Sequence, residues 1–288
     1  RVDLGIAAMI TLTWITNDEA PSPLRAEHGL AFWIETPEGQ LLFDTGGSGE
    51  VLTHNLDCLD LRPEKLNAVV LSHGHDDHTG GLGGILPQLP ADTPLYAHPT
   101  LFRERYSRHE TLESRTMPLS RAEVAARMEL RLDATPREVL PGVWTSGEIT
   151  RRLHPEGSSA HHFIKVGGEY TSDPYEDDLS LIIESEEGLF LLCGCCHAGL
   201  LNTIEHVQRR WERPLIGIAG GMHLGSASEE VIDQTVTALR TLGLRQGRPL
   251  RYLWPGHCSG DAFQQALAQT FGPSIYRAGQ SGGKLTLT

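Results

Sequence analysis

The feature that most constrains this chain is a short segment in which metal-binding side chains follow directly on an apolar run. Residues 71–84 read LSHGHDDHTGGLGG, and the apolar run 68–71 leads into them. If the extended backbone continues, His73 and His75 lie on the same side of it, because side chains two residues apart in a strand share a face. Two imidazoles held in this way can converge on one metal ion.

The same segment supplies two more ligand-type side chains. Asp77 and His78 come where the chain enters its glycine-rich part, and they add an oxygen and a nitrogen that can hold a second ion nearby. A polar loop with histidines by chance is the alternative interpretation, but four such residues within six positions favour a metal site. We expect a site for two ions at the end of a strand.

Apolar runs of strand length alternate with segments of helical periodicity along the chain. Tight turns at residues 37–39 and 186–188 join successive runs into hairpins. Strands come in such meanders in both halves, so a four-layer αββα sandwich of the α/β class explains the pattern better than one doubly wound sheet. Strands are expected at 9–15, 30–36, 41–44, 68–71, 95–97, 162–166, 179–184, 189–193, 215–219, 251–254 and 284–287, and helices at 199–211, 228–242 and 261–270.

One stretch differs in composition from the rest. Residues 100–140 hold eight Arg and six Glu with only scattered apolar residues. This composition favours exposed helices, and we expect a single domain over 1–288 with a charged helical insertion or lid at about 100–140. Five of its arginines could grip a substrate phosphate if the segment folds over the site, although a solvated helix face is the alternative. They are Arg103, Arg105, Arg108, Arg115 and Arg121.

Charge and hydropathy exclude two classes of function. The 24 Lys and Arg against 37 Asp and Glu give a net charge of −13, and no long basic run offsets it, so we expect no nucleic-acid partner. The longest nearly apolar run, 189–201, is shorter than the roughly 20 residues that span a bilayer. It also contains His197, so we expect no membrane span. Residues 1–15 are interpreted as a strand rather than an export signal.

The cysteines bear on the compartment. There are five of them, an odd number, and three crowd into residues 193–196, where mutual pairing is geometrically awkward. A reducing, cytoplasmic setting fits this usage best. The sequence contains no P-loop motif, so a P-loop mechanism has no support.

The string His-Gly-His-Asp-Asp-His at 73–78 resembles the HxHxDH motif of the metallo-β-lactamase superfamily, and Phe-Asp-Thr-Gly at 43–46 resembles its FDTG strand end. The resemblance extends through nearly the whole chain. Four further strings are similar to one subgroup, the dihydropterin-methyl-aminobenzene phosphate synthase-like proteins. They are EHG at 27–29, CCHAG at 195–199, GGMHL at 220–224 and PGHCSG at 255–260.

The resemblance implies a metallo-β-lactamase fold and a distribution of ligands over two ions. The first ion takes His73, His75 and a third histidine. The second takes Asp77, His78 and a C-terminal histidine, which is His257 here, with an aspartate bridging both ions. This chain departs from that pattern, because the third-histidine position falls near Pro174 and the bridging position falls on Cys195.

Substitutes for the missing third histidine are at hand. His197 lies two residues past Cys195, so on an extended strand end both point the same way. We favour His197 as the third nitrogen ligand, with Cys195 offering a thiolate or lining the site. His161 or His162, which precede the hairpin, are the alternatives.

Other residues are expected near the ligands. His223 ends a strand at the same edge, and we assign it to substrate binding or to the surroundings of the ligands rather than to direct ligation. Asp44 is expected to accept a hydrogen bond from a ligand histidine and fix its tautomer. His28, with Glu27, either orients an active-site group or forms a structural pair.

These residues define the functional hypotheses. Two divalent ions lower the pKa of a shared water and polarise a substrate oxygen. The first hypothesis is therefore a dinuclear metal-dependent hydrolase of a small anionic ester or phosphoester, with Asp77, His197 and His223 as its catalytic residues. Alternatives are a pterin-methyl transferase or synthase of the subgroup's type, or a catalytically silent ligand sensor.

The cofactor expectation follows from the ligand types. Imidazole and carboxylate suit zinc, iron and manganese, and a thiolate at Cys195 would favour zinc. We expect two ions, zinc first, with iron or manganese as alternatives. The expected partner is a small-molecule substrate, and assembly into a homo-oligomer is compatible with the sequence.

Overall fold

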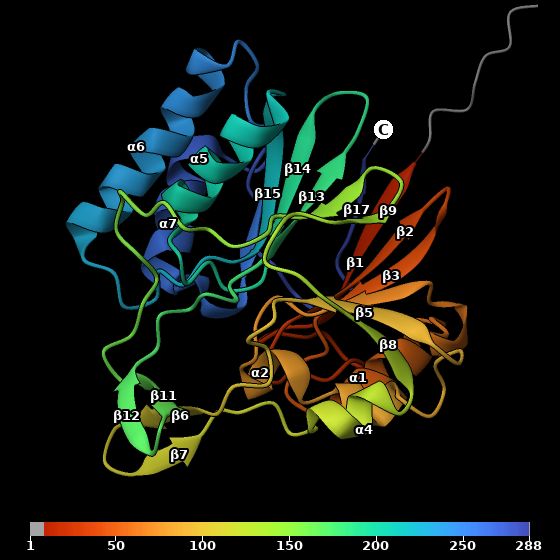
Figure 1. The fold of residues 1–288 in the computed structure, drawn as a ribbon. Coiled ribbons are helices and arrows are strands. Elements are labelled where there is room, and N and C mark those ends of the chain that lie inside the picture. Colours follow the sequence, from red (N-terminus) through yellow and green to blue (C-terminus); the bar gives the residue numbers. More distant parts are fainter. Residues whose placement is uncertain (1–8, 288) are drawn as a thin grey trace, which may run out of the picture.

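The computed structural model describes residues 9–287, in which two β-sheets pack face to face with helices on their outer sides (Figure 1). The seven-stranded sheet has the order β17-β1-β2-β3-β4-β5-β8, and the six-stranded sheet has the order β16-β15-β14-β13-β10-β9. The first sheet comprises β17 (Lys284–Leu287), β1 (Ile10–Thr16), β2 (Ala31–Thr36), β3 (Gly39–Phe43), β4 (Ala68–Val70), β5 (Thr93–Ala97) and β8 (Met128–Leu132). The second comprises β16 (Tyr252–Gly256), β15 (Leu215–Gly221), β14 (Leu189–Cys193), β13 (Ser180–Glu184), β10 (Val143–Thr145) and β9 (Glu138–Leu140).

Helices cover the outer face of each sheet (Figure 1). Four lie beside the seven-stranded sheet, namely α1 (Gly49–Cys58), α2 (Asp76–Thr79), α3 (Leu82–Ile85) and α4 (Arg121–Ala125). Three cover the six-stranded sheet, namely α5 (Leu200–Trp211), α6 (Glu229–Arg245) and α7 (Asp261–Phe271). Short 3-10 turns occur at Pro63–Lys65 and His257–Ser259. No helix within residues 9–287 is both long and apolar enough to span a membrane.

Apolar side chains fill three layers, one between the sheets and one beneath each set of helices. Between the sheets, Trp14 of β1 meets Trp254 of β16 edge to face, with ring centroids 5.3 Å apart. On the other side of the six-stranded sheet, α5 packs one apolar face against the sheet. This face comprises Leu200, Ile204 and Val207, as their helical spacing predicts. The four-layer α/β prediction is confirmed.

Two groups of parallel strands bring functional loops to one edge. β3, β4 and β5 run parallel in the first sheet, and β14, β15 and β16 run parallel in the second. Because parallel strands end at the same side of a sheet, the loops that follow β4, β14, β15 and β16 gather there. All the histidine motifs found in the sequence after residue 70 lie in these loops.

The prediction of exposed helices at about 100–140 is wrong for most of the stretch, because only the five-residue α4 is helical. β8 and β9 extend the edges of the two main sheets. In β8 the residues alternate between apolar and charged, which is the period of a strand, and the charges had concealed that period. The remaining strands of the stretch join two later ones in a small separate sheet, β12 (Glu169–Ser172), β11 (His162–Val166), β6 (Arg105–Arg108) and β7 (Leu112–Ser114).

The bounds of the other elements agree with the sequence to within a few residues. β11, β14 and β17 match residue for residue, and Ser228 caps α6 by accepting a hydrogen bond from the Val231 amide. Residues 1–8, which the first predicted strand region included, lie outside the described residues.

A buried ion cluster fastens the small sheet to the rest of the molecule. The Arg105 side chain is 1% exposed, and its guanidinium nitrogens lie 2.6 Å from Asp177 Oδ2 and 3.2 Å from Asp173 Oδ2. The same Asp177 oxygen accepts a hydrogen bond of 2.8 Å from the Gly74 amide. The small sheet therefore holds the histidine-rich loop from one side.

We predict that Arg105→Ala lowers the free energy of unfolding by about 3 to 5 kcal/mol, because two carboxylates would stay buried without their counter-charge. Arg103→Ala is the matched control, since its ion pair with Glu176 is partly exposed and should contribute about 1 kcal/mol or less. Urea denaturation followed by tryptophan fluorescence measures both losses. Equal losses for the two variants would contradict this role of Arg105.

Candidate metal centre

Four strand ends deliver the ligand-type side chains to one place. His73 and His75 follow β4, and His75 caps the short α2 that carries Asp77 and His78. The loop after β14 carries Cys195 and His197, His223 follows β15, and His257 follows β16.

The first cluster consists of His73, His75 and His197. One nitrogen from each lies within 4.8 Å of the other two, and all three residues are buried. His197 donates its Nδ1 proton to the Gly157 carbonyl at 3.0 Å, so its Nε2 presents a lone pair. That Nε2 is buried without any hydrogen-bond partner, as a ligand nitrogen awaiting an ion would be.

The second cluster consists of Asp77, His78 and His257, whose ligand atoms also lie within 4.8 Å of one another. Asp44 accepts a hydrogen bond from His78 Nδ1 at 2.7 Å, which is the role expected for it. Asp18 accepts in the same way from His257 Nδ1 at 2.8 Å. Both imidazoles therefore turn Nε2 toward the centre, in the carboxylate-histidine arrangement found around metal ions.

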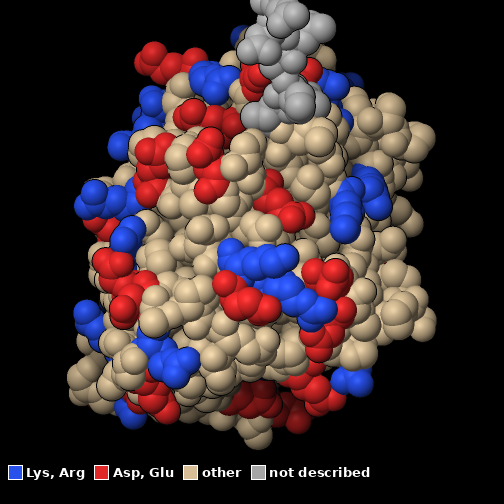
Figure 2. Space-filling model, turned by 90° about the vertical axis from the view of Figure 1, so that its right-hand side faces the viewer, with Lys and Arg blue, Asp and Glu red and all other residues tan. Residues whose placement is uncertain are grey.

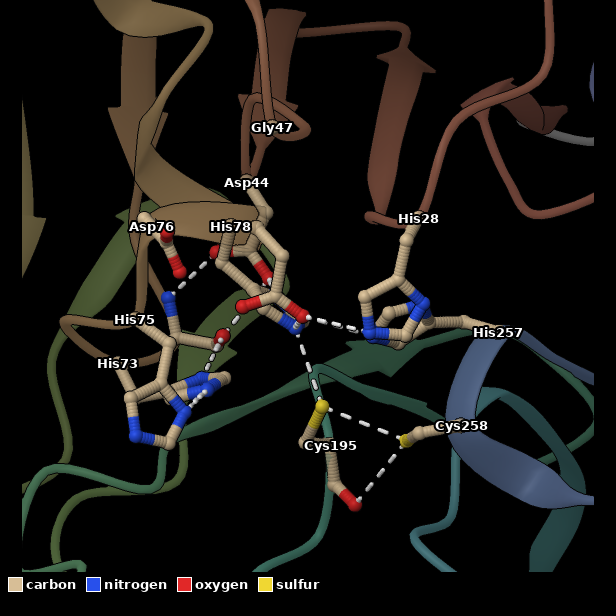
Figure 3. A network of polar contacts seen from close by, with 12 residues as sticks. His28, Asp44, Gly47, His73, His75, Asp76, His78, Cys195, His257 and Cys258 are labelled. Carbon is tan, nitrogen blue, oxygen red and sulfur yellow. Dashed lines mark hydrogen bonds and ion pairs between the residues drawn. The ribbon is translucent and has the colours of Figure 1, made fainter. Parts of the chain in front are cut away.

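Cys195 lies between the clusters (Figure 3). Its Sγ is 3.0 Å from His78 Nε2 and forms a third potential ligand group with His73 and His78. It thus contacts members of both clusters, as a residue in the bridging position would.

The charges around the site favour the binding of a cation. Burial and the neighbouring imidazoles lower the pKa of His73 and of His197 well below the usual value, so both are neutral and free to ligate. Burial would raise the pKa of Asp77, but His78 and His257 hold it well below its usual range. Burial would lower the pKa of His78, yet Asp77 and Asp44 raise it. The carboxylates beside these nitrogens stabilise a positive charge, which a divalent ion would supply. The imidazole and carboxylate donors therefore fit zinc-like metals.

Backbone strain concentrates here. Eight non-glycine residues among residues 9–287 have a positive φ, and five of them belong to or adjoin the centre. Such conformations cost energy and persist where the surroundings hold them, which is common at functional sites. The five are Asp44 (57°), Tyr175 (48°), Cys196 (56°), His223 (43°) and His257 (48°).

The alternative third histidines lie outside both clusters. His161 is exposed and hydrogen bonds through Nδ1 to the Arg108 carbonyl. His162 is nearer, with its ring 5.0 Å from that of His75, but its Nδ1 is engaged with the Tyr175 hydroxyl at 3.0 Å. Neither belongs to a potential ligand group that includes His73 or His75.

The structure resolves one role that the sequence analysis left open, that of His28, and adds residues that it did not assign to the centre. His28 lies over His257, hydrogen bonds to Asp18 at 2.9 Å and approaches Asp77 Oδ2 at 3.5 Å. The EHG string at 27–29 indicated that His28 could orient an active-site group. Asp18 belongs to no motif, so the sequence gave no indication of its role. Tyr175 stacks on His197, with ring centroids 4.2 Å apart. Cys258 was signalled only by its position next to His257.

The centre opens into a cavity of about 200 Å³. His223 lies in its wall, with its ring 4.3 Å from that of His197, and is not a member of either metal cluster. Of the five arginines considered as a phosphate grip, only Arg115 lines this cavity. The lining residues are His28, His75, Asp77, Ser107, His109, Arg115, His162, Cys195, His197, His223, His257 and Cys258.

The model of the metallo-β-lactamase superfamily matches residues 24–171. A relative from Methanocaldococcus jannaschii, a 7,8-dihydropterin-6-methyl-4-(β-D-ribofuranosyl)-aminobenzene-5′-phosphate synthase, is 30% identical over 94% of this chain and 94% of its own. The chain belongs to the metallo-β-lactamase superfamily. The resemblance to the superfamily and to the synthase-like subgroup is therefore confirmed.

Solved structures of this superfamily agree on the fold. A metal-dependent hydrolase of the β-lactamase superfamily superposes with a TM-score of 0.80 at 23% identity, covering 96% of this chain and 98% of its own. A diphosphatase from the PhnP family gives a TM-score of 0.51 at 14% identity, covering 97% of both chains. At these identities the likeness shows the architecture alone.

We predict that His197, and not His161 or His162, supplies the third nitrogen of the first ion. His197→Ala should weaken zinc binding by more than the roughly 10- to 100-fold that loss of an outer partner costs. The double variant His161→Ala/His162→Ala should lose less than that, because neither imidazole stands in the cluster. Competitive titration with a zinc chelator measures both affinities, and a larger loss in the double variant would refute the assignment.

Proposed function

We propose that this protein is a dinuclear metal-dependent hydrolase of a small anionic ester or phosphoester. The observation that carries the proposal is the pair of convergent clusters, in which His197 Nε2 is buried without a hydrogen-bond partner. His73, His75 and His197 would hold the first ion. Asp77, His78 and His257 would hold the second, with Cys195 between them.

Two bound divalent ions would supply an activated water at neutral pH and polarise the substrate oxygen. The protein's own groups orient and shield that chemistry. Tyr175 stacked on His197 restricts the ring, and the buried neighbours of the clusters exclude bulk water. We assign zinc to both positions, since a cysteine stands among the imidazoles.

Residues in the cavity wall would accept or relay the proton of the attacking water. Burial lowers the pKa of His223, which keeps its imidazole neutral and able to accept or relay a proton. Asp77 also lines the cavity but is engaged with His78 and His257, whereas Asp76 lies outside it. His223 is therefore the better general base or substrate-positioning group.

Substrate charge and size follow from the cavity. Arg115 is the only Lys or Arg among its lining residues, and it can donate to a phosphate or carboxylate. The volume of about 200 Å³ is below the usual range for drug-sized ligands, which suits a small molecule or the reacting end of a larger one. All five cysteines are free, and we retain the reducing cytoplasm as the expected compartment.

A second candidate is transfer of a pterin-methyl group from its phosphate or pyrophosphate ester to an aromatic ribosyl phosphate. The synthase at 30% identity over nearly the full length favours it. Metal-loaded protein should be offered these two substrates together and, separately, a chromogenic phosphodiester and a chromogenic carboxylic ester. Condensation without hydrolysis of the chromogenic esters would favour the synthase, and the reverse would favour the hydrolase.

We predict that His75→Ala removes at least one ion per chain and abolishes hydrolysis, because the first cluster would keep only two nitrogens. Elemental analysis of the dialysed variant measures the metal content, and a chromogenic phosphodiester reports the activity. His54→Ala is a suitable control, since His54 lies on α1 and outside every potential ligand group. Full metal content in the His75 variant would overturn the site.

We also predict that Arg115→Ala raises the KM for an anionic substrate by roughly 10-fold or more, as expected when a charge-assisted hydrogen bond of about 1.5 to 3 kcal/mol is lost. The KM for a neutral ester should change little. Arg121→Ala is the matched control, because Arg121 is exposed on α4 and does not line the cavity. Similar KM increases for anionic and neutral substrates would contradict a role in charge recognition.

A further inference from the structure

A second cysteine stands at the centre beside the one that the sequence analysis considered. Cys258 directly follows His257 in the 3-10 turn after β16, and its Sγ lies 3.3 Å from Cys195 Sγ (Figure 3). Ligand atoms of Cys195, His257 and Cys258 all lie within 4.8 Å of one another. Both cysteines also line the cavity.

The fold brings these sulfurs together by a close approach of three parallel strand ends. Cys195 follows β14 and Cys258 follows β16, with the end of β15 between them. Gly221 ends β15, and a Cβ there would lie 2.8 Å from Cys258 Sγ and 2.3 Å from the Gly194 carbonyl oxygen. A side chain at this position would therefore push the two cysteine loops apart.

Core packing accounts for two other cysteines but not for this one. Cys193 and Cys196 belong to the apolar cluster beneath the helices of the second sheet, whereas Cys258 does not. Cys258 instead faces polar groups, and its Sγ accepts a hydrogen bond of 3.3 Å from the His223 amide. An amide donor stabilises negative charge on sulfur, which is the form that binds metals.

The spacing of the sulfurs agrees better with a shared ion than with a disulfide. Two thiolates on one zinc, each at about 2.3 Å and separated by roughly a tetrahedral angle, lie about 3.8 Å apart. A disulfide would require about 2.05 Å. The observed 3.3 Å, at which Cys258 Sγ donates a hydrogen bond to Cys195 Sγ, is nearer the first value, and both cysteines are free. His257 Nε2 is also buried here, 3.3 Å from Asp77 Oδ2, which is itself a potential ligand atom.

We propose that Cys195 and Cys258 both bind the second ion as thiolates, together with His257, and so make this half of the centre selective for zinc over manganese. The inference rests on the proposed function, because it assumes that an ion binds here. Cys258 then supplies a second negative charge beside Cys195, which lies between the two clusters. Soft sulfur ligands favour zinc, whereas manganese prefers oxygen.

X-ray absorption at the zinc edge tests the ligand count directly. Protein reconstituted with two zinc ions under reducing conditions should show about one sulfur per zinc, averaged over both ions, at about 2.3 Å. Cys258→Ser and Cys195→Ser should each halve that sulfur signal. Cys58→Ser is the matched control, because Cys58 is exposed at the end of α1 and its variant should leave the signal unchanged.

A second measurement needs no variant at the centre. Cys258 in the wild-type protein should react with iodoacetamide without metal and be protected when zinc is added, as peptide mass spectrometry can show. Cys58 should react equally in both states. Manganese at the same concentration should protect Cys258 far less than zinc does.

The outcomes separate this inference from the function on which it rests. Two bound zinc ions with an unchanged sulfur signal in Cys258→Ser, or equal alkylation of Cys258 with and without zinc, would overturn the thiolate pair and leave the hydrolase proposal standing. Wild-type protein that binds no zinc would overturn the dinuclear hydrolase itself. If Cys258→Ser does not fold, the alkylation of the wild-type protein decides the question.

Discussion

Both metal clusters depend on one buried carboxylate, that of Asp44 at the end of β3. Its Oδ1 accepts the Ser72 amide at 2.7 Å, and its Oδ2 accepts both the Ser72 hydroxyl and His78 Nδ1 at 2.7 Å. Ser72 Oγ in turn lies 2.9 Å from His73 Nδ1. A single anion, fully buried and in a left-handed conformation, therefore orients one histidine of the first cluster and one of the second. This contact therefore fixes how the two clusters lie relative to each other.

The same loop is held from its other side by the small sheet. Arg105 neutralises Asp173 and Asp177, and these carboxylates reach back to the histidine loop. Asp177 binds the Gly74 amide, and Asp173 Oδ2 lies 3.8 Å from His75 Nε2. A buried arginine is costly to desolvate unless its partners are well placed, so the cluster specifies one position of the small sheet relative to the loop. The charged stretch is thus part of the scaffold of the centre. On the face of the molecule that Figure 2 shows, acidic and basic side chains lie interspersed.

The sequence carried enough information for the architecture and for the ligand-type residues of both clusters. Helical periodicity located α5 and α6, because each has one apolar face, and a short apolar run located β14, which is buried at every position. The spacing of residues 73–78 predicted two clusters, and the placement of His197 followed from the end of β14. What failed depends on tertiary contacts. Charges hid the strand period of β8, and Asp18 comes to His257 only because the end of β1 lies beside the end of β16.

Substrate recognition and ligand geometry are coupled through the small sheet. Ser107, His109 and Arg115 in the cavity wall come from the same segment as Arg105, whose ion pairs position the loop of His73 and His75. Arg115 also donates a hydrogen bond to the Ser107 hydroxyl, and its carbonyl oxygen accepts one from the Asp76 amide, so the wall and the start of α2 are joined directly. A change in this segment that alters the substrate would therefore also shift the backbone that carries Asp77 and His78. Sub-ångström shifts matter at such a centre, because ligand geometry sets the affinity for each ion. Divergence of specificity on this scaffold is accordingly easier at Arg115 and His109, whose side chains are partly exposed, than at Arg105, whose side chain is buried.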